Sequence, residues 1–214
     1  MELLDTTTAG LVASKLLEIK AIKLQPNEPF TWASGWKSPI YCDNRLALSY
    51  PEVRTLIKDK LVEVAGNNFE RVEAIAGVAT AGIPQGALLA DAMDLPFLYV
   101  RSKAKGHGMT NMIEGKVTTG QRVLVIEDLV STGGSSLKAV QDLRNAGFDV
   151  VGMVAIFTYG FEVARENFAK ADVKLVCLSD YNALLPKAIE ENYVSDADLE
   201  SLSTWRKDPG SWSV

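Results

Sequence analysis

Short apolar runs alternate with amphipathic segments through the middle of the chain. The apolar runs have the length of buried strands and span residues 72–78, 95–101, 123–126, 150–157 and 173–178. Segments with apolar side chains at helical spacing follow several of these runs and cover residues 85–93, 137–145 and 162–169. Because strands that alternate with helices favour parallel pairing, this order predicts an α/β fold with a parallel sheet flanked by helices on both faces.

The two ends of the chain follow other patterns. Residues 11–20 and 50–64 have the apolar spacing of helices. Residues 30–41 are rich in aromatic and turn residues, which is typical of short strands around a turn. We expect a single domain over residues 1–214, in which residues 182–214 form a C-terminal tail that is mainly helical.

Composition and charge narrow the class of protein. Apolar residues make up 47% of the chain and charged residues 23%, which is typical of a globular protein and excludes a disordered one. Lys and Arg number 22 and Asp and Glu 27, so the net charge is −5. Such a surface repels nucleic acid and anionic membranes, and we expect neither as a partner.

Three further observations indicate a cytoplasmic protein. The longest apolar run, residues 150–161, is too short to span a bilayer. Glu2 and Asp5 stand where an export signal would be basic. Cys42 and Cys177 are far apart and form no CxxC pair, which excludes a zinc ribbon or a disulfide scaffold and fits a reducing compartment.

The segment with the clearest chemistry is residues 123–136, VLVIEDLVSTGGSS. An apolar strand is followed by Glu127 and Asp128, at the end of the strand where ligands bind in open α/β sheets. Small residues then lead into a helix, whose backbone N–H groups and N-terminal partial charge bind phosphate. The Gly-Lys-Ser/Thr of a Walker A loop and the Gly-x-Gly-x-x-Gly of a dinucleotide site are both missing. The pattern suits a ribose 5-phosphate, with acids on the 2′- and 3′-hydroxyls and amides on the phosphate; the alternative is a small-residue turn beside two solvated acids.

Residues 101–116 form a second candidate site. Four basic side chains fall within seven residues, namely Arg101, Lys103, Lys105 and His107, which is the only histidine of the chain. Glycines at positions 106, 108 and 115 supply hinges. A basic, glycine-rich loop is able to close over a pyrophosphate and exclude water, while the alternative is a solvated loop with ordinary lysines.

These motifs resemble those of the type I phosphoribosyltransferases, and within them the enzymes that act on orotate. Residues 30–39, FTWASGWKSP, are similar to an N-terminal motif of those enzymes, and residues 82–84, Gly-Ile-Pro, are similar to their pyrophosphate-loop motif. Residues 101–108, continued by residues 113–115, resemble their catalytic loop. The motifs occur in family order, and the similarity covers about residues 15–195.

The resemblance implies a fold, a reaction and an assembly. It implies a small N-terminal hood formed by residues 1–45. The implied reaction transfers ribose 5-phosphate from phosphoribosyl pyrophosphate to orotate, giving orotidine 5′-phosphate and pyrophosphate on the route to UMP. Mg²⁺ is the implied cofactor, held mainly through the substrate, with no direct protein ligand. The implied assembly is a homodimer in which the loop 101–116 serves the partner's site.

The resemblance also assigns residues. The catalytic residues are Asp128, Lys105 and His107. The residues for phosphoribosyl pyrophosphate are Arg101, Lys105, His107, Glu127, Asp128, Leu129, Val130, Ser131, Thr132, Gly133, Gly134 and Ser135. Ser131 also contacts orotate, although by itself it is equally typical of a helix N-cap or a turn. The chain departs from many members at Ala33, Ala81 and Ser102, where they carry lysine, and at Cys42, where they carry an aromatic residue.

Other substrates, and another class of protein, also fit parts of the sequence. A pyrimidine carboxylate needs a cationic or N–H-rich pocket, which the residues alone do not identify. The aromatic residues Phe30, Trp32, Trp36 and Tyr41 would flank a pyrimidine or pack in the core. One alternative is a transferase for a purine or for uracil. Another is a regulator that senses phosphoribosyl pyrophosphate and binds RNA or DNA, against which the charge of −5 argues.

Overall fold

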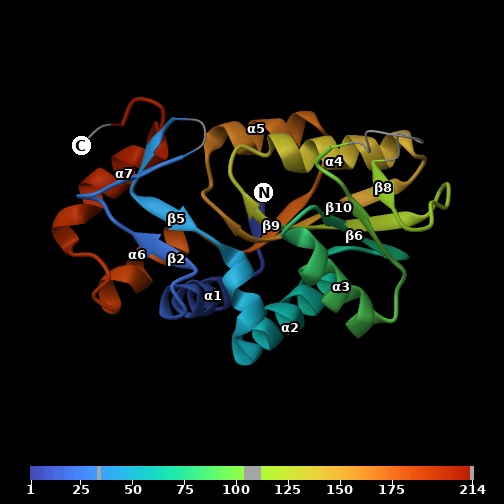
Figure 1. The fold of residues 1–214 in the computed structure, drawn as a ribbon, viewed down its shortest axis with the longest axis horizontal. Coiled ribbons are helices and arrows are strands. Elements are labelled where there is room, and N and C mark those ends of the chain that lie inside the picture. The colour runs from blue at the N-terminus through green and yellow to red at the C-terminus, as the bar shows by residue number, and fades with distance from the viewer. Residues whose placement is uncertain (33–34, 104–111, 213–214) are drawn as a thin grey trace.

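A mostly parallel sheet forms the centre of the computed structural model, which describes residues 1–32, 35–103 and 112–212. In these ranges the sheet has seven strands in the order β1-β11-β10-β9-β6-β7-β8, and only the β7–β8 pair is antiparallel (Figure 1). The strands are β1 (Glu2–Leu3), β11 (Leu175–Asp180), β10 (Asp149–Thr158), β9 (Arg122–Val130), β6 (Ala74–Val78), β7 (Phe97–Val100) and β8 (Ile113–Glu114). The predicted parallel sheet is confirmed.

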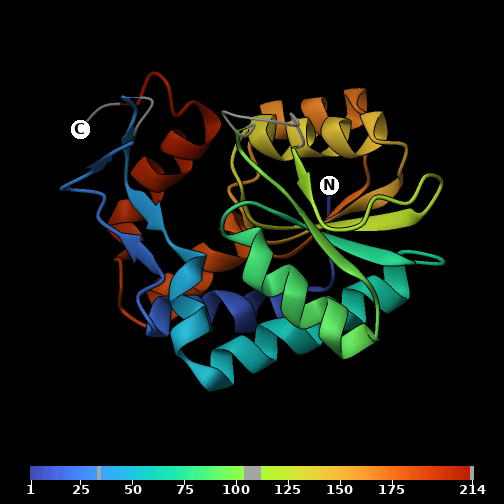
Figure 2. The ribbon, with the colours of Figure 1, turned by 45° about the vertical axis from the view of Figure 1, so that its right-hand side comes forward.

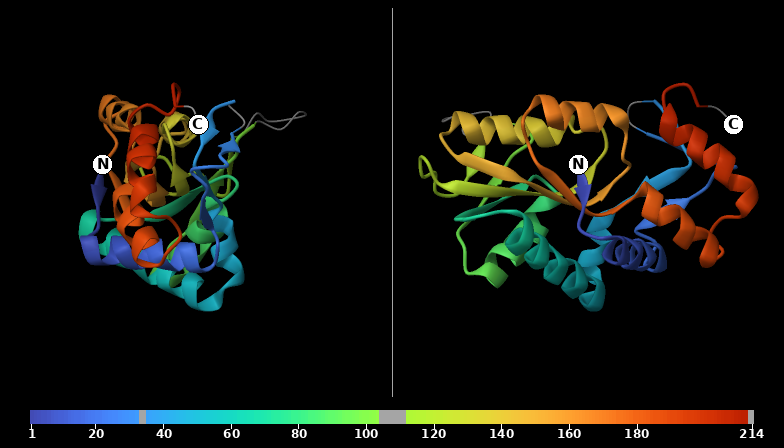
Figure 3. Two further views of the ribbon diagram at one scale, coloured as in Figure 1. Left: turned by 90° about the vertical axis from the view of Figure 1, so that its left-hand side faces the viewer. Right: turned by 180° about the vertical axis from the view of Figure 1, so that it is seen from behind.

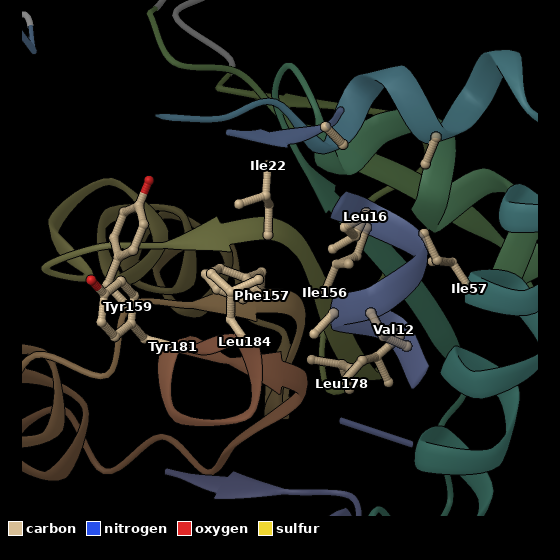
Figure 4. Packing of buried hydrophobic residues seen from close by; sticks show 14 of the residues in the cluster. Val12, Leu16, Ile22, Ile57, Ile156, Phe157, Tyr159, Leu178, Tyr181 and Leu184 are labelled. Carbon is tan, nitrogen blue, oxygen red and sulfur yellow. The ribbon is translucent and has the colours of Figure 1, made fainter. Parts of the chain in front are cut away.

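Helices cover both faces of this sheet, as Figure 2 shows. One face carries α1 (Thr6–Glu18), α2 (Pro51–Asn68) and α3 (Gly82–Met93), and the other carries α4 (Gly134–Asn145) and α5 (Glu162–Lys170). Strand β9 alternates between two buried clusters, with Leu124 and Ile126 in one and Val123 and Val125 in the other. Both faces of the strand are therefore buried, which explains its continuous apolar sequence. Figure 4 shows the first cluster, where α1 packs on β10 and β11.

A side lobe stands at one end of the sheet (Figures 1 and 3). It consists of two short antiparallel ribbons and the last two α-helices: β2 (Ile22–Leu24) with β5 (Ile40–Cys42), β3 (Phe30–Thr31) with β4 (Lys37–Ser38), α6 (Tyr181–Glu190) and α7 (Leu199–Lys207). The side chain of Trp205 in α7 is fully buried and contacts the rings of Trp32, Tyr159, Phe161 and Tyr181. This contact joins the C-terminal helix to the N-terminal ribbons and to the end of β10. A short 3₁₀ helix, η1 (Asn44–Ser49), leads from the lobe into α2, and another, η2 (Asp196–Asp198), precedes α7.

Several elements differ in extent from the sequence prediction. Strand β9 continues through the acid pair to Val130, because β10 pairs with it along this stretch. Helix α1 begins at Thr6, since the carboxylate of Asp5 accepts a hydrogen bond from the backbone N–H of Thr8 at 2.7 Å. Helix α4 begins at Gly134 instead of residue 137, and α3 at Gly82 instead of residue 85. The edge strands β1 and β8 are two residues each, too short for a periodic pattern. No helix in the described ranges has the length and apolarity needed to cross a membrane.

Close backbone contacts set the position of α3 on the sheet. A Cβ atom on Gly82 would lie 2.4 Å from the carbonyl oxygen of Ile126 in β9, and one on Gly77 would lie 2.7 Å from the carbonyl oxygen of Gly82. Only glycine permits these approaches. They bring the first turn of α3 against the end of β9, directly before the acid pair.

We predict that Gly82→Ala lowers the free energy of unfolding by about 1–3 kcal/mol, because the added methyl group overlaps a backbone oxygen that has no room to move. Urea denaturation measures the change. Gly66→Ala is the matched control: Gly66 lies exposed in α2, and a Cβ atom added there would have no neighbour within 4 Å, so this change is expected to be neutral or stabilising. Equal stability of Gly82→Ala and the wild-type protein would contradict the packing argument.

Candidate functional site

The candidate site lies at the carboxyl ends of β9 and β10. Thr158 pairs with Val130 in the sheet, and its Oγ1 donates a hydrogen bond to the carbonyl oxygen of Val130 at 2.9 Å. The backbone N–H of Gly160 in turn donates to Oγ1 of Thr158 at 3.1 Å. These bonds hold together the two loops that follow the strands, so the residues after β9 have a firm support.

Glu127 connects the acid pair to the next helix. Its side chain is buried, and its Oε2 accepts a hydrogen bond at 2.9 Å from the hydroxyl of Ser136 in the first turn of α4. Its Oε1 accepts from the backbone N–H of Asp128 at 3.1 Å. Burial, together with repulsion from the Asp128 carboxylate, raises the pKa of Glu127 to about 8. The Glu127 side chain thus links the end of β9 to the first turn of α4, and it also carries a titratable group.

Asp128 lies nearer to solvent than Glu127. Its backbone carbonyl accepts a hydrogen bond from Nδ2 of Asn44 at 2.7 Å, which ties β9 to the segment that leaves the side lobe. Burial raises the pKa of Asp128, while the guanidinium of Arg45 acts in the opposite direction. Arg45 is itself paired with Asp43, at 2.6 Å from Nε to Oδ1.

The loop after β9 leads into a helix N-terminus without a side-chain cap. Gly133 is the N-cap of α4 and has φ +83°, and a Cβ atom there would lie 2.7 Å from the Phe168 ring. The carbonyl of Thr132 accepts a hydrogen bond from Asn167 at 3.0 Å, so the loop is held from outside. With no side-chain acceptor, the first N–H groups of α4 are available to an anion. The interpretation of Ser131 as the helix N-cap is wrong, because that position belongs to Gly133.

A cavity of about 300 Å³ opens beside this loop. Its walls come from the side lobe and from the ends of β9 and β10, and are formed by Thr31, Trp32, Tyr41, Cys42, Leu129, Ser131 and Tyr159. The volume is at the small end of ligand pockets, and the aromatic walls suit a planar ring. Burial and the charge of Asp128 raise the pKa of the Cys42 thiol well above its usual value, and burial does the same for the pKa of Tyr159, so both groups are neutral in the cavity.

The sequence analysis assigned Ser131 to orotate, and Ser131 lines this cavity; it did not single out Tyr159, which lines the cavity as well. The aromatic residues that were weighed for the base divide: Trp32 and Tyr41 line the cavity, whereas Phe30 packs on Tyr41 with 5.6 Å between ring centroids. The signal for Tyr159 is its position directly after the long apolar run of β10, beside the turn at Gly160.

The sequence analysis assigned both Arg101 and Ser135 to phosphoribosyl pyrophosphate. These two residues line a second cavity of about 80 Å³, together with Lys138 and Ser102. Nη1 of Arg101 lies 3.1 Å from Oε1 of Glu114, which holds the guanidinium at the start of the basic loop. Lys105, His107 and Ala33 lie outside the described residues. Ala81 is the residue before α3.

Metal-binding chemistry is limited to few groups. Within residues 1–32, 35–103 and 112–212, no three His, Cys, Asp or Glu side chains gather closely enough to hold an ion. Glu127 and Asp128 offer oxygen donors, the kind that Mg²⁺ prefers.

We predict that the stability of the ligand-free protein falls as pH rises, and that Glu127→Gln reduces this dependence. The pKa of Glu127 is about 8 in the folded protein against an ordinary 4.5, so the folded state binds more protons between these values. The free energy of unfolding therefore decreases with pH in this window, by at most about 1.4 kcal/mol per unit from this group. Urea denaturation at pH 5, 6.5 and 8 measures the slope. Glu166→Gln, on the exposed side of α5, is expected to keep the wild-type slope; an unchanged slope in Glu127→Gln would contradict the assignment.

Comparison with known proteins agrees with this geometry. The family model described as "Phosphoribosyl transferase domain" matches residues 45–182, which include the acid pair and the loop after it. The chain is 58% identical over 201 residues to an orotate phosphoribosyltransferase of Cytophaga hutchinsonii, covering 94% of this chain and 96% of that protein. It is 57% identical over 208 residues to one of Porphyromonas gingivalis, covering 97% and 99%.

Solved structures show the same fold. The crystal structure of orotate phosphoribosyltransferase from Aeropyrum pernix superposes with a TM-score of 0.74 at 34% identity, over 82% of this chain and 97% of that chain. The structure of Leishmania donovani UMP synthase gives a TM-score of 0.77 at 28% identity, over 92% of this chain and 42% of that longer one. With such identity over nearly its whole length, the protein belongs to the orotate phosphoribosyltransferases of the phosphoribosyl transferase family.

Proposed function

We propose that this protein transfers the ribose 5-phosphate group of phosphoribosyl pyrophosphate to orotate, forming orotidine 5′-phosphate and pyrophosphate in the synthesis of UMP. The observation that carries the proposal is one arrangement: the acid pair lies between an uncapped helix N-terminus and a small aromatic cavity. A sugar phosphate with a base at its anomeric carbon would place its phosphate, its ribose and its base against these three groups in this order. Family membership supports the same reaction.

The ribose phosphate would bind along the end of β9. Residues 131–135 lie where the N–H groups of α4 begin, and they would hold the 5′-phosphate. Glu127 and Asp128 would accept hydrogen bonds from the ribose hydroxyls. Asp128, the more exposed of the two, would also stabilise the positive charge that develops on the sugar as pyrophosphate leaves. Leu129 and Val130 contribute through their position in the strand.

Orotate would occupy the aromatic cavity next to Ser131. The ring would lie between Trp32, Tyr41 and Tyr159, with the Ser131 hydroxyl on its edge. This position is adjacent to the ribose site, because Leu129 and Ser131 line the cavity and belong to the same stretch as Asp128. The anomeric carbon would therefore face the ring nitrogen that attacks it.

Mg²⁺ is the proposed cofactor, and the site fits a cation held mainly by substrate. Asp128 and Glu127 would contribute through the ribose hydroxyls that they bind. When bound, the cation neutralises charge on the departing pyrophosphate. The basic residues of the loop would act on the same leaving group: Arg101 at its start, and Lys105 and His107 further along it. The acid pair would then act on the ribose alone.

We further propose that the enzyme is a cytoplasmic homodimer. The loop 101–116 would serve the site of the partner subunit, as the family resemblance implies. Both cysteines are free thiols, in keeping with a reducing compartment.

The activity is tested by ultraviolet absorbance of orotate mixed with phosphoribosyl pyrophosphate and Mg²⁺. We expect orotate to disappear with one pyrophosphate formed per orotate, and removal of Mg²⁺ with a chelator to abolish the reaction. Adenine, guanine and uracil serve as competing bases. Turnover of another base without orotate would overturn the proposal, and a salt-dependent shift of RNA or DNA without any turnover would favour the regulator instead.

Exchange of subunits tests the acid and the loop together. Asp128→Asn and Lys105→Ala are each expected to lower kcat by ~100-fold or more, because each removes a charge that acts in the transition state. In a mixed dimer both defects fall on one site and the other site is intact. Random mixing makes about half of the dimers mixed, so roughly a quarter of wild-type activity should return. Differently tagged chains verify mixing; verified mixed dimers without activity would contradict the shared site.

A further inference from the structure

The described walls of the cavity proposed for the base carry no positive charge. Among the described residues that line it, none is basic, and Glu127 and Asp128 stand nearby at the end of β9. Orotate carries a carboxylate on its ring. A carboxylate placed there without a cation would be desolvated close to two acids, which is unfavourable. A cation close to these walls would therefore favour the binding of orotate.

Lys37 reaches the cavity edge through Thr31. The two residues are opposite each other in the β3–β4 ribbon, and Nζ of Lys37 donates a hydrogen bond to Oγ1 of Thr31 at 2.9 Å. Thr31 is itself a wall of the cavity. We propose that Lys37 and Thr31 together bind the carboxylate of orotate. The inference rests on the proposed function and adds to it the group that distinguishes orotate from an uncharged pyrimidine.

The chemistry of the pair suits a carboxylate. An ammonium has three N–H donors, and the bond to Thr31 uses one of them. A threonine hydroxyl that accepts from lysine keeps its own proton to donate. The pair thus presents donors of two kinds at one edge of the cavity, and the charge of Lys37 strengthens both.

The position of Lys37 is fixed by the core of the side lobe. Its backbone carbonyl accepts a hydrogen bond from Nε1 of Trp205 at 3.2 Å. Trp205 is fully buried, and its ring lies 5.7 Å from the rings of both Trp32 and Tyr159, two walls of the cavity. The backbone that carries the lysine is therefore tied to the walls between which the ring would lie, and only the side chain has to adjust.

Two arginines near the cavity are bound to protein oxygens. Arg45 forms two hydrogen bonds with the carboxylate of Asp43, at 2.6 and 2.9 Å. Arg206 donates to the backbone carbonyls of Tyr159 and Gly160 at 3.3 and 3.2 Å. Lys37, in contrast, donates to a neutral hydroxyl, which leaves its charge to act on a ligand. This difference favours Lys37 over the two arginines.

The test compares two nucleotides that differ only in the carboxylate, orotidine 5′-phosphate and uridine 5′-phosphate, by titration calorimetry. In the wild-type protein we expect the first to bind at least about 10-fold more tightly. Lys37→Met is expected to lower the affinity for orotidine 5′-phosphate by about 10- to 100-fold and the affinity for uridine 5′-phosphate by less than about 3-fold. Thr31→Val, which suits a strand, should weaken orotidine 5′-phosphate by a smaller factor, about 3- to 10-fold.

Lys207→Met, a change of an exposed lysine at the end of α7, is the matched control and should leave both affinities unchanged. Equal weakening of both nucleotides by Lys37→Met would show a structural role and overturn the inference, as would an unchanged preference for orotidine 5′-phosphate. Loss of the preference in Arg206→Met, with Lys37→Met unaffected, would assign the carboxylate to Arg206. If the wild-type protein turns over no orotate, the proposed function fails; if it does and Lys37→Met keeps the preference, only the role of Lys37 fails.

Discussion

A buried acid, Glu127, is the constraint on which the loop between β9 and α4 depends. Placing it beside Asp128 at the end of β9 costs free energy, and the bonds from Ser136 and from the backbone N–H of Asp128 offset part of that cost. The bond to Ser136 spans the loop of small residues, so the strand end and the helix start are held at one separation. The loop between them has its shape determined from both sides.

The base side of the site depends on a different contact. Trp205 packs between the N-terminal ribbons, α6 and the end of β10, and so gathers residues from both ends of the chain. The cavity that results has walls from residues 31–32, 41–42, 129, 131 and 159. A C-terminal helix far from β9 in sequence thus shapes the cavity that is proposed for the base. Substitution of Trp205 in this helix is expected to act on the cavity through packing, because its ring contacts two of the walls.

The two sides meet at β9. The strand carries the acid pair, supplies Leu129 and Ser131 to the cavity and, through the carbonyl of Asp128, binds Asn44 from the segment that leaves the lobe. In the proposed binding mode, one strand would therefore set the distance from base to sugar and from sugar to phosphate. The close contact between Gly82 and Ile126 adds the first turn of α3 to the same strand end. Four segments therefore fix the end of β9: the one that carries Asn44, the first turns of α3 and α4, and strand β10.

Local pattern in the sequence determined the parallel sheet, its flanking helices and the run from the acid pair to Ser135, because strand, loop and helix there are neighbours along the chain. Resemblance added the reaction and the base. Only the tertiary structure decided that Gly133 and not Ser131 precedes α4, that Tyr159 and Cys42 share a cavity with Trp32, and that Lys37 stands at its edge. Some of these relations join segments far apart in the chain, as the bond between Asn44 and Asp128 does, and no periodicity reports them. They arise from packing, in which a side chain's partners depend on how whole elements meet.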